Sequence, residues 1–129
     1  MIPAIIVCHG KLSESLLHAV EGICGQVESM TGMSNDGMSG TELAGRIEKQ
    51  LIEFDGRTIM FTDYFGGSCA TACLSQMARD DSLRLISGVN LPTLIYYLGH
   101  RHELEIDELV AGIIHRGQNS IRELHPPEL

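Results

Sequence analysis

The sequence predicts an α/β fold, a three-layer α/β/α sandwich with a mainly parallel central sheet of about four to five strands. Short continuous apolar runs are typical of strands buried on both faces of such a sheet. They alternate along the chain with longer segments in which apolar residues recur at helical spacing. Because the crossover between two parallel strands is right-handed, this alternation predicts helices on both faces of the sheet.

Four segments have the composition of strands. The first and third are uniformly apolar or β-branched, as expected for buried strands. The second is more polar and has no clean alternation, so we expect it near an edge of the sheet. In chain order the expected strands are residues 4–8, 27–33, 58–62 and 83–89.

Five segments have helical periodicity, and several are bounded by capping residues. Gly25 follows the first, Thr41 or Ser39 can cap the second, and Asn90 with Pro92 in the first turn begins the fourth. The residues of the third helix expected to face the core are Ala70, Cys73, Leu74 and Met77. In chain order the helical segments are residues 12–24, 41–54, 68–77, 91–98 and 106–121.

The bulk properties predict a single globular domain. A chain of 129 residues with 43% hydrophobic and 20% charged residues is long enough for one core, which we expect to comprise residues 1–125, with residues 126–129 as a loose tail. No apolar run approaches the ~20 residues of a membrane span, and no signal peptide is evident, so we expect a cytoplasmic protein. A net charge of −8 without a basic stripe argues against nucleic acid as a partner.

Chemically capable residues follow two of the predicted strands. His9 comes directly after the first strand, and Asp63 comes directly after the third. The turn Gly66-Gly67-Ser68 then opens a helix. A histidine or an aspartate at a strand end is often incidental, but ligands of parallel sheets bind beside the carboxyl ends of the strands. We therefore expect these residues to form one site.

This combination of residues favours phosphoryl transfer to and from a histidine. A carboxylate at Asp63 that accepts a hydrogen bond from one ring nitrogen of His9 would leave the other nitrogen as the nucleophile. The turn formed by Gly66, Gly67 and Ser68 leads into a helix, and the N–H groups and dipole at that helix end would hold the phosphate. No nucleotide-binding loop or Mg²⁺ ligand set is evident, so we expect no cofactor and a phosphorylated protein as donor.

Three ordered segments of the chain carry a resemblance to a known family. The segments "IIVCHGKLSESLLHAVEGICG", "FTDYFGGS" and "LISGVNLPTLIYYL" resemble signature segments of the mannose/fructose-type enzyme IIA domains of the bacterial phosphoenolpyruvate:sugar phosphotransferase system (PTS). The resemblance implies a phosphotransferase of sugar transport that is a homodimer. It also implies that His9 is phosphorylated by the phosphocarrier protein HPr, with Asp63 beside the ring and Ser68 in the phosphate loop.

The resemblance also implies further partners. Such domains pass the phosphoryl group to a IIB protein, which phosphorylates sugar entering through the membrane components IIC and IID. We expect no second domain after residue 125, so the IIB protein is expected to be a separate chain. The family usually has proline and asparagine where this sequence has Cys69 and Thr71, a difference that bears on the acceptor and the rate.

Two alternatives remain open at the level of sequence. One is a regulatory module that senses the phosphorylation state of an incomplete phosphotransferase system. The other is a metal-binding module, because cysteine, histidine and aspartate are zinc ligands and several lie near strand ends: Cys8, His9, Asp63, Cys69 and Cys73. The spacing of Cys69 and Cys73 is not that of a common zinc knuckle, and we expect Cys24 and Cys73 to be small core residues. No metal site is therefore predicted.

Overall fold

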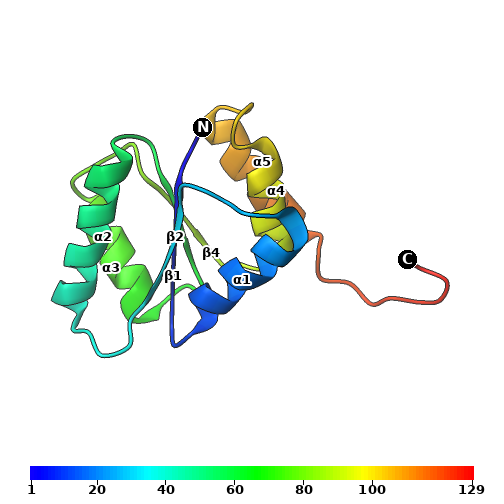
Figure 1. Ribbon diagram of the computed structural model, residues 1–129, viewed down its shortest axis with the longest axis horizontal. Coiled ribbons are helices and arrows are strands. Elements are labelled where there is room, and N and C mark those ends of the chain that lie inside the picture. Colours follow the sequence, from blue (N-terminus) through cyan, green and yellow to red (C-terminus); the bar gives the residue numbers. More distant parts are fainter.

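A four-stranded parallel sheet forms the centre of the computed structural model, which describes residues 1–129 (Figure 1). The spatial order of the strands is β2-β1-β3-β4, so the polar second strand lies at an edge, as predicted. All three strand pairs are parallel, which confirms the predicted fold class. The strands are β1 (Ala4–Cys8), β2 (Met30–Ser34), β3 (Ile59–Thr62) and β4 (Arg84–Ser87).

Five helices cover the two faces of the sheet, as Figure 1 shows. One face carries α1 (Leu12–Cys24), α4 (Leu91–His100) and α5 (Ile106–Gln118), and the other carries α2 (Gly40–Phe54) and α3 (Gly67–Met77). None of these helices is long and apolar enough to cross a membrane. After Asn119 the chain forms neither helix nor strand, and Figure 1 shows this segment leading away from the body of the protein.

The uniformly apolar composition of β1 is explained by its central place in the sheet. All five of its residues are fully buried. Because successive side chains of a strand point to opposite faces, Ile6 packs in the cluster beneath α1, α4 and α5, and Ile5 packs in the cluster beneath α2 and α3. The strand therefore packs between two apolar clusters, and this packing fixes the position of His9, which follows it.

The register of the strands brings three of their carboxyl ends to within one residue of each other at one edge of the sheet. Cys8 of β1 pairs with Ser34 of β2, and Val7 of β1 pairs with Thr62 of β3. The next residue along each strand is His9, Asn35 and Asp63, respectively. The sheet therefore brings these three residues to its carboxyl edge, with His9 level with Asn35 and Asp63 one position behind, level with Cys8.

Two predicted capping residues are confirmed. The side chain of Ser39 accepts a hydrogen bond from the backbone N–H of Glu42, and the Glu42 side chain accepts one from the backbone of Ser39. Ser39, rather than Thr41, is therefore the N-cap of α2. Asn90 caps α4 through an equivalent reciprocal pair with Thr93.

Several residues differ from their predicted places. Leu74 is 54% exposed, because the buried face of α3 is set by Cys69, Ala72, Cys73 and Gln76, and Leu74 lies one position around the helix from it. Cys24, the last residue of α1, is exposed rather than a core residue. Ile121 lies outside α5, which ends at Gln118, and its side chain is exposed.

Candidate functional site

His9 stands at the point where the buried strand β1 reaches the surface. Its side chain is 36% exposed, whereas Cys8 before it is fully buried. Gly10 follows with a φ of +60°, a left-handed conformation that side chains disfavour, and this turn leads directly into α1. A Cβ at Gly10 would meet no atom of this chain within 4 Å, so the approach to the turn is open.

Asp63 holds both the backbone and the ring of His9. One carboxylate oxygen, Oδ2, accepts a hydrogen bond from the His9 backbone N–H at 2.9 Å and lies 2.8 Å from the ring nitrogen Nδ1. The other oxygen, Oδ1, accepts hydrogen bonds from the Tyr64 backbone N–H at 3.0 Å and from the Thr62 hydroxyl at 3.3 Å. The carboxylate is thus fixed by four contacts, and its side chain is 13% exposed.

These contacts determine the charge state of Asp63. Burial raises the pKa of the Asp63 carboxyl, but hydrogen bonds from His9 and Tyr64 outweigh burial and hold the pKa below its ordinary value. An ionised carboxylate can only accept hydrogen bonds, so the proton of the His9–Asp63 contact lies on Nδ1. When the ring is neutral, this proton on Nδ1 leaves the lone pair on Nε2.

The glycine loop lies against the Nε2 side of the ring. A Cβ at Gly67 would lie 3.2 Å from Nε2 of His9 and 2.7 Å from the Tyr64 hydroxyl. Gly66 and Gly67 also have φ angles of +130° and +74°, which favour glycine. The Tyr64 ring packs at 5.4 Å from the His9 ring, centroid to centroid. Glycine is therefore favoured at Gly67 both by its backbone conformation and by its closeness to the His9 ring and the Tyr64 hydroxyl.

The helix after this loop begins one residue earlier than predicted. Gly66 is the N-cap of α3, and Ser68 lies in the first turn of the helix. No side chain caps this helix end. Ser68 itself is exposed, and its backbone belongs to the turn whose N–H groups have no partner within an α-helix. Such an end attracts an anion through those N–H groups and the helix dipole.

Asn35 is a site residue that the sequence reasoning missed. Its side-chain oxygen accepts a hydrogen bond from the Gly10 backbone N–H, and its side-chain nitrogen donates one to the Ser68 hydroxyl, both at 3.3 Å. It therefore bridges the turn after His9 and the first turn of α3. The available signal was its place just beyond the carboxyl end of the second expected strand.

Cysteine thiols lie beneath the site. Burial raises the pKa of Cys69 to about 11 and that of Cys8 and Cys73 to about 12, with the Asp63 charge contributing at Cys8 and Cys69. All four cysteines are free. The donor atoms of His9, Asp63 and Cys69 lie within 4.8 Å of one another, so these are the residues that could hold a metal. However, a metal would have to displace hydrogen bonds of Asp63 and a proton from a buried thiol, so the set fits a metal poorly.

The fold and site together define a parallel α/β domain that presents a carboxylate-oriented histidine beside an uncapped helix end. The sequence model of the family described as "PTS system fructose IIA component" matches residues 4–114. The chain therefore belongs to this family of enzyme IIA components, whose members are phosphotransferase components of sugar transport.

Individual relatives support the same assignment. The chain is 27% identical over 110 residues to the "PTS system sorbose-specific EIIA component" of Klebsiella pneumoniae, covering 84% of this chain and 82% of that protein. It is 30% identical over 129 residues to the "PTS system mannose-specific EIIAB component" of Escherichia coli K12, covering 95% of this chain but only 39% of that longer protein. A crystal structure of phosphotransferase system component EIIA from Streptococcus agalactiae superimposes with a TM-score of 0.89 at 26% identity, covering 95% of this chain and 97% of that one.

The lowered pKa of Asp63 makes one contribution to stability dependent on pH. The ionised carboxylate is the form that the fold stabilises, so this contribution is fully present above the unfolded-state pKa of about 3.9 and is lost as the pH falls through the lower folded-state pKa. We expect Asp63→Asn to lower the free energy of unfolding in urea at about pH 7 and to cost less at about pH 3. An equal cost at both pH values would contradict the proposed role of the charge.

Proposed function

We propose that His9 is a phosphoryl carrier, which accepts a phosphoryl group from phospho-HPr and passes it to a IIB protein. The observation that carries the proposal is the pair of contacts on the His9 ring: Nδ1 lies 2.8 Å from the Asp63 carboxylate, and Nε2 faces Gly67. Gly67 lies equally close to Cε1 and Nε2 of the ring, so Nε2 stands beside the glycine loop while Nδ1 is occupied by Asp63. Membership of the enzyme IIA family supports the same chemistry.

The transfer step follows from this geometry. The Nε2 lone pair of His9 forms a bond to phosphorus while the bond from phosphorus to the donor breaks, and that electron pair leaves with the donor. The ring gains positive charge as Nε2 bonds, and the Asp63 carboxylate beside Nδ1–H stabilises that charge. The Nδ1 proton stays in place, so the reverse step toward the acceptor needs no proton to be moved.

The phosphoryl oxygens would be held by the loop. Gly66, Gly67 and Ser68 lie at the N-terminus of α3, where backbone N–H groups and the helix dipole favour negative charge. Asn35 would keep the Ser68 hydroxyl and the Gly10 turn in register across the site. Positioning and charge stabilisation are the main requirements of phosphoryl transfer, and this set of residues supplies both.

A protein donor suits the surroundings of His9. Tyr64 and Phe65 follow Asp63 directly, and their side chains are 55% and 87% exposed. Apolar and aromatic side chains are favoured at the centres of protein interfaces. The exposed side chains of Tyr64 and Phe65 therefore support docking of HPr, and then of IIB, over His9.

We also propose that the chain acts as a homodimer that serves membrane components IIC and IID from the cytoplasm. The edge strand β4 has a neighbour on one side only, and Ile121 and Leu124 beyond α5 are exposed. Unpaired strand edges and exposed apolar side chains favour association.

Phosphorylation of the chain tests the proposal directly. With phosphoenolpyruvate, enzyme I and HPr we expect one acid-labile phosphoryl group per chain, detected as a mass increase and located at His9 by peptide mapping. His9→Ala should abolish the increase because it removes the nucleophile. His18→Ala, which changes an exposed histidine of α1, is the matched control and should be labelled like the natural chain. Labelling that persists in His9→Ala would refute the assignment.

The bridging role of Asn35 has its own test. Asn35→Ala removes two hydrogen bonds to the site, each with a net contribution of about 1 kcal/mol, so we expect phosphorylation by phospho-HPr to slow by up to about thirtyfold. The rate is measured by rapid quenching and mass spectrometry. Asp36→Ala, at the exposed neighbouring position, should keep the natural rate. Equal rates for the two variants would show that Asn35 does not organise the site.

A further inference from the structure

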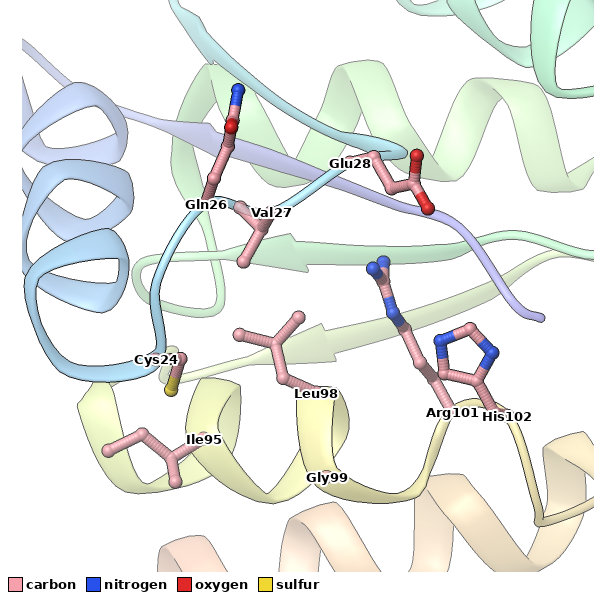
Figure 2. Close-up of a pocket in the computed structure, with 9 residues that line it drawn as sticks. All are labelled: Cys24, Gln26, Val27, Glu28, Ile95, Leu98, Gly99, Arg101 and His102. Carbon is pink, nitrogen blue, oxygen red and sulfur yellow. The ribbon is translucent and has the colours of Figure 1, made fainter.

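A second pocket lies at the opposite end of the sheet from His9. It has a volume of about 700 Å³ and is formed by the end of α1, the segment that leads to β2, and the end of α4 (Figure 2). The backbone N–H of Ile2, just before β1, donates a hydrogen bond to the Arg101 carbonyl, which places the pocket beside the amino end of this strand. The phosphoryl site, by contrast, follows the carboxyl end of β1.

Arg101 is the unusual residue of this pocket. It is only 5% exposed, and no carboxylate lies within 4.0 Å of its guanidinium group. Its buried Nε has no hydrogen-bond partner. A buried charge is normally paired, because removing it from water without compensation is costly. Figure 2 shows the guanidinium group extending from the end of α4 into the space between the segments that line the pocket.

The protein holds this guanidinium in place without neutralising it. One terminal nitrogen donates a hydrogen bond to the Tyr97 hydroxyl at 3.1 Å, and the group lies 5.4 Å from the centre of the Tyr97 ring. The Tyr97 hydroxyl donates in turn to the Ile2 carbonyl at 2.6 Å. Tyr97 is a neutral partner and accepts only one of the five guanidinium N–H groups. Arg101 is therefore oriented in advance, which lowers the entropic cost of binding a ligand.

The remaining lining suits an anion that carries an apolar body. Val27, Ile95 and Leu98 supply apolar surface, and Gln26 and His102 supply polar nitrogen atoms. The acidic residue of the lining is Glu28, which is exposed and forms no ion pair with Arg101. The charge of Glu28 would therefore weaken the binding of an anion by repulsion, but its carboxylate does not occupy the guanidinium of Arg101.

We propose that this pocket binds a small organic anion, with its carboxylate or phosphate oxygens on the Arg101 guanidinium and its apolar part against Val27 and Leu98. Arginine matches both kinds of oxyanion, because its planar N–H groups form paired, charge-assisted hydrogen bonds with them. The chain carries a net charge of −8, so long-range attraction does not favour anions, and local contacts at Arg101 must provide the affinity. The site is independent of the proposed chemistry at His9.

The proposal is tested by NMR titration of the ¹⁵N-labelled full chain. The probes are benzoate and phenyl phosphate, which share an aromatic body but differ in the oxyanion, and benzyl alcohol as the uncharged control. We expect saturable shifts of the backbone amides of residues 24–28 and 98–102 with at least one anion, and none with the alcohol. Preference for benzoate or for phenyl phosphate identifies the oxyanion as carboxylate or phosphate.

Variants assign the binding to Arg101. Arg101→Met should weaken binding by about tenfold or more, as loss of a charge-assisted hydrogen bond predicts. Glu28→Gln should tighten binding, and this exposed change also serves if Arg101→Met does not fold. Arg79→Met, which removes an exposed arginine elsewhere, and His9→Ala should both bind like the natural chain.

Three results would overturn the proposal. They are the absence of saturable shifts in these segments for both the natural chain and Glu28→Gln, equal binding of benzyl alcohol, and equal weakening by Arg79→Met. Because binding is measured without phosphorylation, none of these results bears on the proposed role of His9.

Discussion

The contact between Asp63 and His9 is the interaction on which the rest of the site depends. One carboxylate oxygen fixes both the backbone and the ring of the histidine, and the other is held by Thr62 and Tyr64. The contact is possible because β1 and β3 are parallel neighbours whose register places Asp63 level with Cys8, one residue before His9. The buried apolar strand β1 thus has a functional consequence: packing on both faces leaves the His9 backbone little freedom to move.

The glycine loop contributes to the site because Gly67 has no side chain and because no side chain caps α3. Gly67 adopts a backbone conformation that favours glycine and lies so close to Nε2 of His9 and to the Tyr64 hydroxyl that a side chain would crowd both. With no side chain capping α3, the helix N-terminus stays available to an anion. Asn35 connects this helix end to the turn after His9, so the edge strand β2 also contributes to the site.

The sequence was sufficient for the architecture and for the prediction that His9, Asp63 and the glycine loop lie together, because these depend on local patterns. Apolar runs identified the strands, and the rule that parallel strands meet at one edge brought His9 and Asp63 together. The sequence could not show that Asn35 belongs to the same site as His9 and Asp63. That placement requires the register of β2 against β1, which no local pattern specifies. Leu74 was misplaced because an apolar residue next to the buried face of a helix cannot be distinguished from one on it. The isolated charge of Arg101 likewise emerges only from tertiary packing.

The most direct test of the central claim is the identity of the phosphorylated ring nitrogen. ¹⁵N and ³¹P NMR of the chain, labelled with ¹⁵N in its histidine rings and phosphorylated through HPr, would assign the nitrogen bonded to phosphorus. The hydrogen bond between Nδ1 and Asp63 predicts that phosphorus is attached to Nε2 of His9 and that Nδ1 keeps its proton. Phosphorus on Nδ1 would contradict the account, because the Asp63 contact could not then orient the nucleophile.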